Sequence, residues 1–324
     1  MKDLKLWKFI YDKIIKKGSV VLYIVAETSN SSPGKQGFKM AVTKSGEQFG
    51  TIGGGIMEAK VVKDSTKLIG SDVISSIHIL HHDPKSDQEK SGLICGGSQT
   101  VITKILGEAD LDFVEEVIEK FKHRSKCLLY VNQNSIKLID SDIYNDRYNF
   151  NYTNSNKFSY KEICGISETA YIIGGGHVGL AVSKIISFLD FYVVNIDHRP
   201  DVFTFRNNEY ANQKIICEYN EAGKYIDEGE MSYVVIVTSQ HTGDKAALKS
   251  VIDKNVKYIG MMGSKRKIDI IFSNLEKDGV DRKVLIKVHT PIGLEIEAES
   301  PEEIAVSIAA EIIRIKNSKD IKIM

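Results

Sequence analysis

The amino-acid sequence predicts an α/β protein with two domains: an N-terminal mixed α/β domain and a C-terminal domain built on a parallel sheet. Its 324 residues exceed what one domain of ~150 residues needs. The hydrophobic fraction of 42% and the charged fraction of 27% are those of ordinary globular proteins, so a full core can form. From Ala170 onward, strand-like and helix-like segments alternate, which is typical of parallel strands covered by helices.

Charge and cysteine content narrow the functional classes. Lysine and arginine together number 43, as do aspartate and glutamate, and no basic stripe with interleaved aromatics occurs, so we expect no nucleic-acid partner. The cysteines lie far apart without a C-x-x-C pair, which argues against a zinc ribbon or a disulfide framework and suits a reducing cytoplasm. They are Cys95, Cys127, Cys164 and Cys217.

The N-terminal segment does not have the features of a targeting signal. Lysines recur throughout residues 1–18, so there is no uninterrupted apolar core and no small-residue cleavage site. Trp7, Ile10 and Ile14 fall at helical spacing before Gly18, which predicts an amphipathic helix docked on the first domain. No apolar run approaches the ~20 residues of a membrane span, so we expect a cytoplasmic protein with no membrane partner.

The rest of the first domain is expected to combine strands with two further helices. Residues 20–26 form a continuous apolar run, typical of a buried strand, and residues 28–37 have the Ser, Gly, Asn and Pro content of a loop. A glycine cluster at 53–55 precedes a helical pattern that runs to about Leu68. Further strands are predicted at 40–43, 73–80, 101–106 and 127–131, and a further helix at 112–123.

The composition changes between Asp140 and Glu168, where Asn, Ser, Tyr and Asp dominate and periodicity is weak. We interpret this segment as a linker that holds one hairpin. The predicted boundaries are therefore 1–139 for the first domain, 140–168 for the linker and 169–324 for the second domain.

The second domain opens with a glycine fingerprint. Gly174, Gly176 and Gly179 follow the spacing G-x-G-x-x-G, directly after an apolar strand and at the start of a helix, and the next strand ends in Asp197. The spacing alone is weak evidence, but this context predicts a Rossmann-type nucleotide-binding domain. The predicted strands are 170–173, 192–197, 214–217, 233–238 and 258–260, and the helices are 178–189 and 245–255.

Each part of the fingerprint has a mechanical reason. The first glycine allows a tight turn, the second lets the backbone approach a pyrophosphate, and the third lets helix and strand pack closely. Asp197 would accept hydrogen bonds from a ribose diol, and Arg199 leaves the choice between a free ribose and a 2′-phosphate open. We group His177 and His198 with these residues, although a solvating role is the simpler interpretation of His177. The alternative for the whole loop is a structural turn that has lost its ligand.

Two later loops are expected at the same edge, because ligands of open parallel sheets bind at the carboxyl ends of the strands. TSQHTGD follows the strand at 233–238, and GMMGSKRK follows the strand at 258–260. A solvated helix start is the alternative for the second loop, but its glycines leave backbone donors accessible, which favours an anion contact. The candidate binding residues are Gln240, His241, Asp244, Gly263, Ser264, Lys265 and Arg266.

The first domain carries a second glycine loop and a cysteine between small residues. Gly53, Gly54 and Gly55 precede a helix, an arrangement that offers backbone N–H groups to an anion, and Glu58 lies in the first turn. Glu58 also fits a simple helix-start role. In the segment GLICGG, we expect Gly96 and Gly97 to leave the sulfur of Cys95 reachable, and adjacent backbone amides can favour its thiolate, the form that attacks or binds metals. A structural role is the alternative for Cys95.

With these residues in view, the chain resembles the xanthine dehydrogenase accessory protein family, XdhC/CoxI. The matching stretches appear in family order over about residues 27–313. They are ETSNSSPGKQGFKM, GTIGGGIMEAKVV, GLICGG, IIGGGHVG with NIDHRPDVF, TSQHTGD, YIGMMGSKRK and TPIGLEIEAESPEEIAVSIAAEI.

The resemblance implies a maturation factor or chaperone rather than a stand-alone enzyme. Members of the family bind the molybdenum cofactor, molybdopterin, help a cysteine desulfurase to sulfurate it, and pass it to a molybdenum hydroxylase. Cys95 matches the cysteine implicated in holding the cofactor, so the resemblance makes Cys95 and Glu58 candidate catalytic residues and Cys95 a candidate molybdenum ligand. Many members carry two adjacent cysteines, whereas Ile94 stands first here, which places the sulfur chemistry on Cys95. We also expect a homodimer.

Two other functions remain open at this point. An NAD(P)-dependent oxidoreductase would need a proton donor facing the nicotinamide, and His241 is the candidate. A nucleotide-sensing binding module without chemistry would leave Cys95 dispensable.

Overall fold

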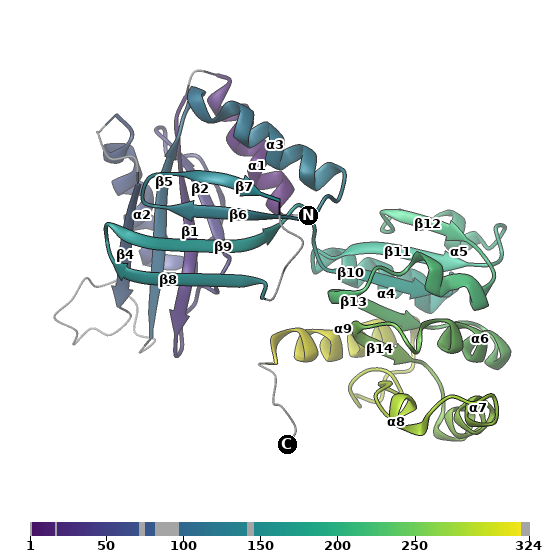
Figure 1. Cartoon of the computed structure of the whole chain (residues 1–324). Coiled ribbons are helices and arrows are strands. Elements are labelled where there is room, and N and C mark those ends of the chain that lie inside the picture. The colour runs from purple at the N-terminus through teal and green to yellow at the C-terminus, as the bar shows by residue number, and fades with distance from the viewer. Residues whose placement is uncertain (1, 17, 71–74, 82–96, 141–145, 319–324) are drawn as a thin grey trace. The chain divides into compact units, whose positions relative to one another are not determined.

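The computed structural model describes residues 2–16, 18–70, 75–81, 97–140 and 146–318, and the chain divides into two compact units, 1–166 and 167–324. Figure 1 labels most of the elements of each unit. The first unit contains α1 (Lys2–Ile14), β1 (Val20–Ser29), β2 (Lys39–Thr43), β3 (Gln48–Gly50), α2 (Gly55–Leu68), β4 (Ser75–His81), β5 (Ser98–Leu106), η1 (Glu108–Asp110), α3 (Leu111–Lys122), β6 (Cys127–Asn132), β7 (Ile136–Ile139), β8 (Tyr148–Asn154) and β9 (Lys157–Cys164).

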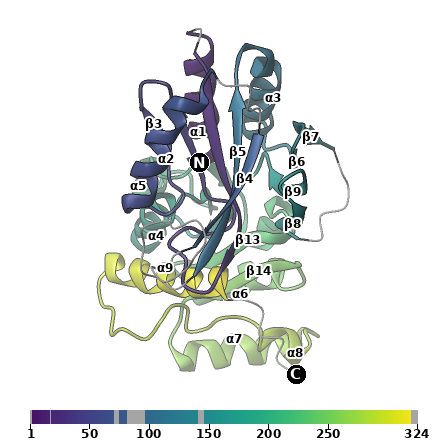
Figure 2. The same ribbon diagram turned by 90° about the vertical axis from the view of Figure 1, so that its left-hand side faces the viewer.

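Two antiparallel sheets form the first unit. One has the strand order β3-β2-β1-β5-β4 and the other β7-β6-β9-β8. Alternate residues of β1 point to opposite faces: Leu22 packs with α1, α3 and the second sheet, whereas Tyr23 packs on the side of α2. Figure 2 shows α2 on one side of β4 and β5, with β6 to β9 on the other. Burial on both faces explains the uninterrupted apolar run at 20–26.

The predicted N-terminal helix is confirmed as α1. Trp7, Ile10 and Ile14 are completely buried in the core between the sheets, as their spacing requires. Ile15, the next apolar residue, lies beyond the end of the helix and is 49% exposed. None of the described helices is long and apolar enough to cross a membrane.

The segment interpreted as a linker is part of the first unit. Its described portion forms the predicted hairpin, β8 and β9, but β9 pairs along its length with β6, from Cys127↔Cys164 to Asn132↔Ser159. Phe158 and Tyr160 are buried in the core on this side. The polar residues that suggested a linker alternate with these core residues, because the outer face of the hairpin meets solvent. The first unit therefore extends to Ile166.

The second unit has the predicted Rossmann-type fold. It contains β10 (Thr169–Ile173), α4 (His177–Phe188), β11 (Tyr192–Asp197), α5 (Phe203–Arg206), β12 (Gln213–Ile216), η2 (Tyr219–Tyr225), β13 (Gly229–Ile236), α6 (His241–Val251), β14 (Val256–Met261), α7 (Lys265–Lys277), α8 (Arg282–Leu285) and α9 (Pro301–Asn317). The strands are parallel in the order β12-β11-β10-β13-β14.

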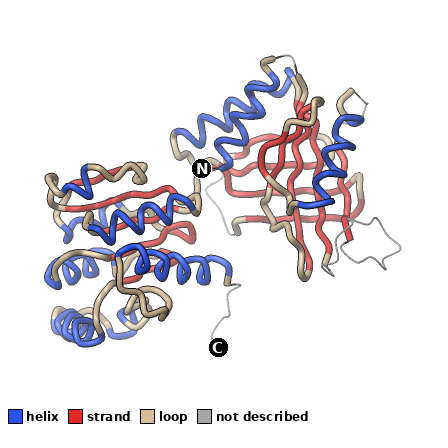
Figure 3. The backbone as a smooth tube through the Cα atoms, turned by 180° about the vertical axis from the view of Figure 1, so that it is seen from behind, coloured by secondary structure: helices blue, strands red, loops and turns tan. Residues whose placement is uncertain are grey.

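Helices cover both faces of this sheet, as Figure 3 shows. The core on one face contains side chains of η2, α6, α7 and α8, and the core on the other contains side chains of α4 and α9. The strand order reverses between β10 and β13, so the loops that leave these two strands diverge and form the crevice where ligands of such sheets bind. The predicted loops of the second domain therefore share this carboxyl edge.

Candidate functional site

The fingerprint glycines divide into structural ones and one that the fold does not require. Gly174 has a φ of +122°, which favours glycine, and a side chain on Gly179 would clash with the Gly174 carbonyl. By contrast, no described atom lies within 4 Å of a Cβ built on Gly176, the N-cap residue of α4. The packing of the fold thus explains the first and third glycines, and the space at the second is free for a ligand.

The carboxylate of Asp197 binds groups of the protein itself. It is completely buried, and its carboxylate accepts hydrogen bonds from the Gly175 amide (2.6 Å), the Tyr219 hydroxyl (3.1 Å) and both the backbone and the guanidinium of Arg199. Burial alone would raise the pKa of Asp197, but the hydrogen bonds from Arg199 and Gly175 hold it below its ordinary value. These donors fill the acceptor sites of the carboxylate, of which an ionised one has about four. The contacts favour an anchor for the glycine loop over the expected ribose acceptor.

The other fingerprint residues lie around this anchor. His177 is exposed at the first position of α4. The His198 ring packs edge-on against Tyr219 at 4.7 Å, with its Nδ1 3.6 Å from Asp197 Oδ1. The side chain of Arg199 is 36% exposed, so its guanidinium is positioned at the rim by Asp197.

The loop after β13 is fixed by Asp244. This residue is completely buried, accepts a hydrogen bond from the Thr238 hydroxyl at 2.6 Å and forms an ion pair with Lys267 of α7. Asp244 therefore ties two loops of the carboxyl edge together instead of facing the crevice. Gln240, the N-cap of α6, and His241, its first residue, are exposed at this edge.

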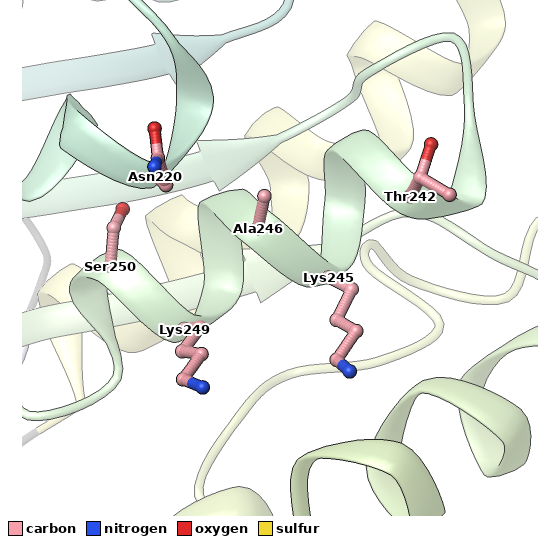
Figure 4. Close-up of a pocket in the computed structure, with 6 residues that line it drawn as sticks. All are labelled: Asn220, Thr242, Lys245, Ala246, Lys249 and Ser250. Atoms are coloured by element: carbon pink, nitrogen blue, oxygen red, sulfur yellow. The ribbon is translucent and has the colours of Figure 1, made fainter. Parts of the chain in front are cut away.

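The loop after β14 borders a cavity. Ser264 is the N-cap of α7 and accepts a hydrogen bond from the Lys267 amide, while Lys265 and Arg266 are exposed in the first turn. Gly263, Ser264 and Lys265 line a cavity of about 510 Å³, which is closed on its other side by residues 291–298 and α9. Another cavity, of about 440 Å³, lies between η2 and α6 (Figure 4), where Lys245 and Lys249 both pair with Asp278 at 3.1 Å.

In the first unit, the glycine loop forms a nest of donors around Glu58. The Oε1 atom of Glu58 accepts hydrogen bonds from the amides of Ile52 (2.8 Å), Gly53 (3.2 Å) and Gly54 (2.7 Å), and from the Thr51 hydroxyl (2.6 Å). Burial raises the pKa of Glu58, but these hydrogen bonds outweigh it and lower the pKa. The predicted anion-binding geometry is present, and the anion in it is a side chain of the protein.

Three glycine-containing segments meet at this nest. A Cβ on Gly34 would clash with the Ile52 carbonyl, one on Gly53 would lie 2.8 Å from the Gly34 amide nitrogen, and one on Gly97 would lie 2.5 Å from the Ser29 carbonyl oxygen. The close approach explains why these positions are glycines. Residues near 30, 53 and 97, distant in sequence, therefore form one cluster.

Gln99 holds the cluster together and was missed by the sequence analysis. It is completely buried, donates to the Ile52 carbonyl at 3.1 Å and accepts from the Ser32 hydroxyl at 3.0 Å. Its polar side chain just before the apolar run of β5 was the available signal. Gly55 begins α2, and Ile56 beside it is 68% exposed. Cys95 and Gly96 lie outside the described residues, whereas Cys127 and Cys164 are buried in the core.

Comparison with known proteins assigns the chain to a family. One family model, described as the XdhC and CoxI family, matches residues 15–76, and another, described as the XdhC Rossmann domain, matches residues 170–312. The chain belongs to the XdhC/CoxI family. The two matches cover the glycine nest and the parallel sheet, whereas Cys95, Gly97 and Gln99 lie between the matched ranges.

Named relatives of this XdhC/CoxI chain differ in length. It is 22% identical over 299 residues to "Uncharacterized protein YqeB" of Escherichia coli (strain K12), with 91% of this chain and 43% of that protein covered. It is 23% identical over 321 residues to a probable xanthine dehydrogenase subunit of Bacillus subtilis (strain 168), with 91% and 93% covered. The chain thus spans less than half of the first relative and nearly all of the second.

A solved structure shares the fold. The crystal structure of a xanthine dehydrogenase from Bacillus halodurans is 20% identical to this XdhC/CoxI chain and superposes with a TM-score of 0.75, over 100% of this chain and 98% of that one.

Proposed function

We propose that this chain is an accessory factor that binds the molybdenum cofactor and supports its sulfuration and insertion into a molybdenum hydroxylase of the xanthine dehydrogenase type. The observation that carries the proposal is the cluster in which the Gly53–Gly54 nest and Gly97, two residues after Cys95 in the sequence, both approach the segment 29–34. Family membership and the relative named as a probable xanthine dehydrogenase subunit support the choice of client.

The nest suits the phosphate of the cofactor. Three amides and one hydroxyl converge on a single carboxylate oxygen of Glu58, and a phosphate oxygen accepts the same charge-assisted hydrogen bonds. Glu58 is the internal anion that a phosphate replaces when it binds there. Ile56, exposed beside Gly55 at the start of α2, offers an apolar contact near the same donors.

Cys95 supplies the soft ligand of the proposed site. A thiolate suits the metal–dithiolene end of the cofactor, and the residues that follow Cys95 in the sequence, Gly96 and Gly97, are small. When bound, the cofactor would supply a molybdenum centre on which a sulfido ligand replaces an oxo ligand. We propose a cysteine desulfurase as the sulfur donor and a second copy of the chain as a further partner.

Retention of molybdopterin by purified protein tests this function. Cys95→Ser preserves the shape of the side chain but removes the soft ligand, so we expect the variant to lose most of its bound molybdopterin while its thermal unfolding stays unchanged. Retention should also rise with pH in the parent protein as the thiol ionises. Equal molybdopterin content in parent and variant would contradict the proposal.

A further inference from the structure

The cavity beside the β14–α7 loop has the size of a small-molecule site. Its volume of about 510 Å³ falls within the ~300–1,000 Å³ of typical ligand pockets. Met262, Ile292, Leu294 and Ile304 contribute apolar wall, and Ile296 in the same lining is 49% exposed. Apolar side chains around an open cavity suit a planar ring.

The walls of this cavity are held in place before any ligand binds. Residues 291–298 have no regular secondary structure, yet the Ile292 amide donates to the Met261 carbonyl at 3.1 Å and the Gly293 amide to Glu311 at 2.8 Å. Leu294 and Ser307 of α9 exchange two hydrogen bonds, of 3.3 and 2.6 Å. A preformed wall reduces the ordering cost of binding.

Opposite charges lie on the two sides of the cavity. Ser264 and Lys265 line it from the first turn of α7, where helix amides add to the positive potential of the lysine. Glu295 and Glu297 line it from the opposing segment. A ligand matched to this lining carries an anionic group at one end and N–H donors at the other.

The crevice at the carboxyl edge of the sheet is accessible beside β14 but obstructed at the end of β11. At the end of β11, the acceptor sites of Asp197 are filled by Arg199, Gly175 and Tyr219, and a Cβ on Gly175 would lie 2.7 Å from Phe205 Cβ. The adenosine half of a dinucleotide would have to enter there. A smaller ligand bound beyond β14 avoids that obstruction.

We propose that this cavity binds a planar heterocycle that carries an exocyclic amino group and a phosphate. The ring lies between the apolar walls, the amino group faces Glu295 and Glu297, and the phosphate faces Lys265. A pterin phosphate and a purine mononucleotide share this chemistry. This cavity is separate from the glycine nest that is proposed to hold the cofactor phosphate, so a pterin bound here is a second one. Preference for the pterin rests on the proposed function, whereas the site itself does not.

Calorimetry on the full chain tests the site with four probes: 6-hydroxymethylpterin phosphate, the same pterin without phosphate, GMP and NAD. We expect the pterin phosphate or GMP to bind more tightly than NAD. Ala298→Trp, which fills the cavity, should lower the affinity by about tenfold or more. Ala246→Trp, its matched control in the cavity of Figure 4, should leave the affinity unchanged.

Lys265→Ala separates the phosphate contact from the ring contact. It should weaken binding of the phosphorylated pterin by about three- to tenfold and leave the unphosphorylated pterin unaffected, with Lys249→Ala as the control. Because Lys265 is exposed, its replacement should not disturb folding, and this variant tests the site if Ala298→Trp fails to fold.

The outcomes are distinct. Binding of the pterin phosphate alone or of GMP alone supports the site and identifies the source of its ligand. The site is overturned if neither binds, if NAD binds more tightly than both, or if folded Ala298→Trp binds like the parent. Cys95→Ser should bind these probes as the parent does. The proposed function is tested by molybdopterin retention in that variant, so its failure can be distinguished from failure of this site.

Discussion

At the scale of single residues, two acids singled out from the sequence prove to be internal anions. Glu58 fills the nest at Gly53–Gly54, and Asp197 fills the acceptor position at Gly175. The sequence predicted where glycine loops would gather donors. It did not predict which acceptor fills them, because that depends on tertiary contacts, such as the hydrogen bond that Tyr219 donates to Asp197 from a distant segment.

Glu58→Gln should loosen the glycine nest. The amide oxygen still accepts hydrogen bonds, but without charge they are weaker, so we expect a loss of about 1 kcal/mol in unfolding free energy. Because the pKa of Glu58 is lowered, its contribution is present above the ordinary value of 4.5 and is lost as the pH falls through the lower folded value. Hydrogen exchange at the Gly53 and Gly54 amides should accelerate. Unchanged protection of both amides would refute this role, and Glu119→Gln on α3 is the control.

Lys104 is a buried cation that we expect to weaken the fold at neutral pH. It is 2% exposed, its ammonium reaches the Gln133 carbonyl at 3.5 Å, and burial lowers its pKa from 10.5 to about 8. Between these values the unfolded chain holds more protons, so unfolding free energy should rise with pH, by about 3 kcal/mol at most.

Lys104→Met should therefore raise the unfolding free energy at pH 7 by about 1–3 kcal/mol and remove its rise above pH 8. Urea unfolding at pH 7 and pH 10 measures both effects. Lys44→Met, at an exposed position, should change neither. A Lys104→Met variant that keeps the pH slope of the parent would show that another group causes it.

At the scale of elements, buried polar contacts join segments that lack regular structure to the helices beside them. Glu311 of α9 accepts hydrogen bonds from Tyr258 of β14 (2.7 Å), the Gly293 amide (2.8 Å) and His289 (3.2 Å), and Arg314 lies 3.4 Å away. This cluster fixes the wall of the cavity. Alternation and glycine signals predicted the strands and α4 within a few residues, but a polar anchor of this kind leaves no periodic pattern.

Glu311→Gln should destabilise the second unit and change its response to acid. Burial raises the pKa of Glu311, but hydrogen bonds from His289, Tyr258 and Gly293 lower it to about 2. The contribution of ionised Glu311 to the unfolding free energy is therefore complete above the ordinary pKa of 4.5 and is lost as the pH falls toward 2.

We expect Glu311→Gln to lower the unfolding free energy at pH 7 by about 2–3 kcal/mol and to flatten the acid limb between pH 4.5 and 2. Thermal unfolding across this pH range is the measurement. The exposed Glu302→Gln on the same helix should behave like the parent. An acid limb as steep as that of the parent would contradict the assignment.

At the scale of the whole molecule, local patterns were sufficient for the parallel sheet and insufficient for the first unit. The parallel direction of the strands follows from the alternation of strands and helices after Ala170, since each crossover is local in sequence. In the first unit, β9 pairs with β6 across a segment that includes β7 and β8, so the pairing is not local, and polar outward residues made the hairpin resemble a linker. The approach of Gly53 to Gly34, and of Gly97 to Ser29, is likewise a tertiary feature.

The central claim is that the cluster at Gly53–Gly97 serves cofactor delivery through Cys95, and client sulfuration tests it most directly. The measurement compares Cys95→Ser with Cys127→Ser, a change in a completely buried strand residue, for the fraction of a xanthine dehydrogenase-type client that gains its sulfido ligand. Cys95→Ser should abolish most of the sulfuration while unfolding like the parent, and Cys127→Ser should retain sulfuration with lower stability. Full client sulfuration by Cys95→Ser would contradict the account.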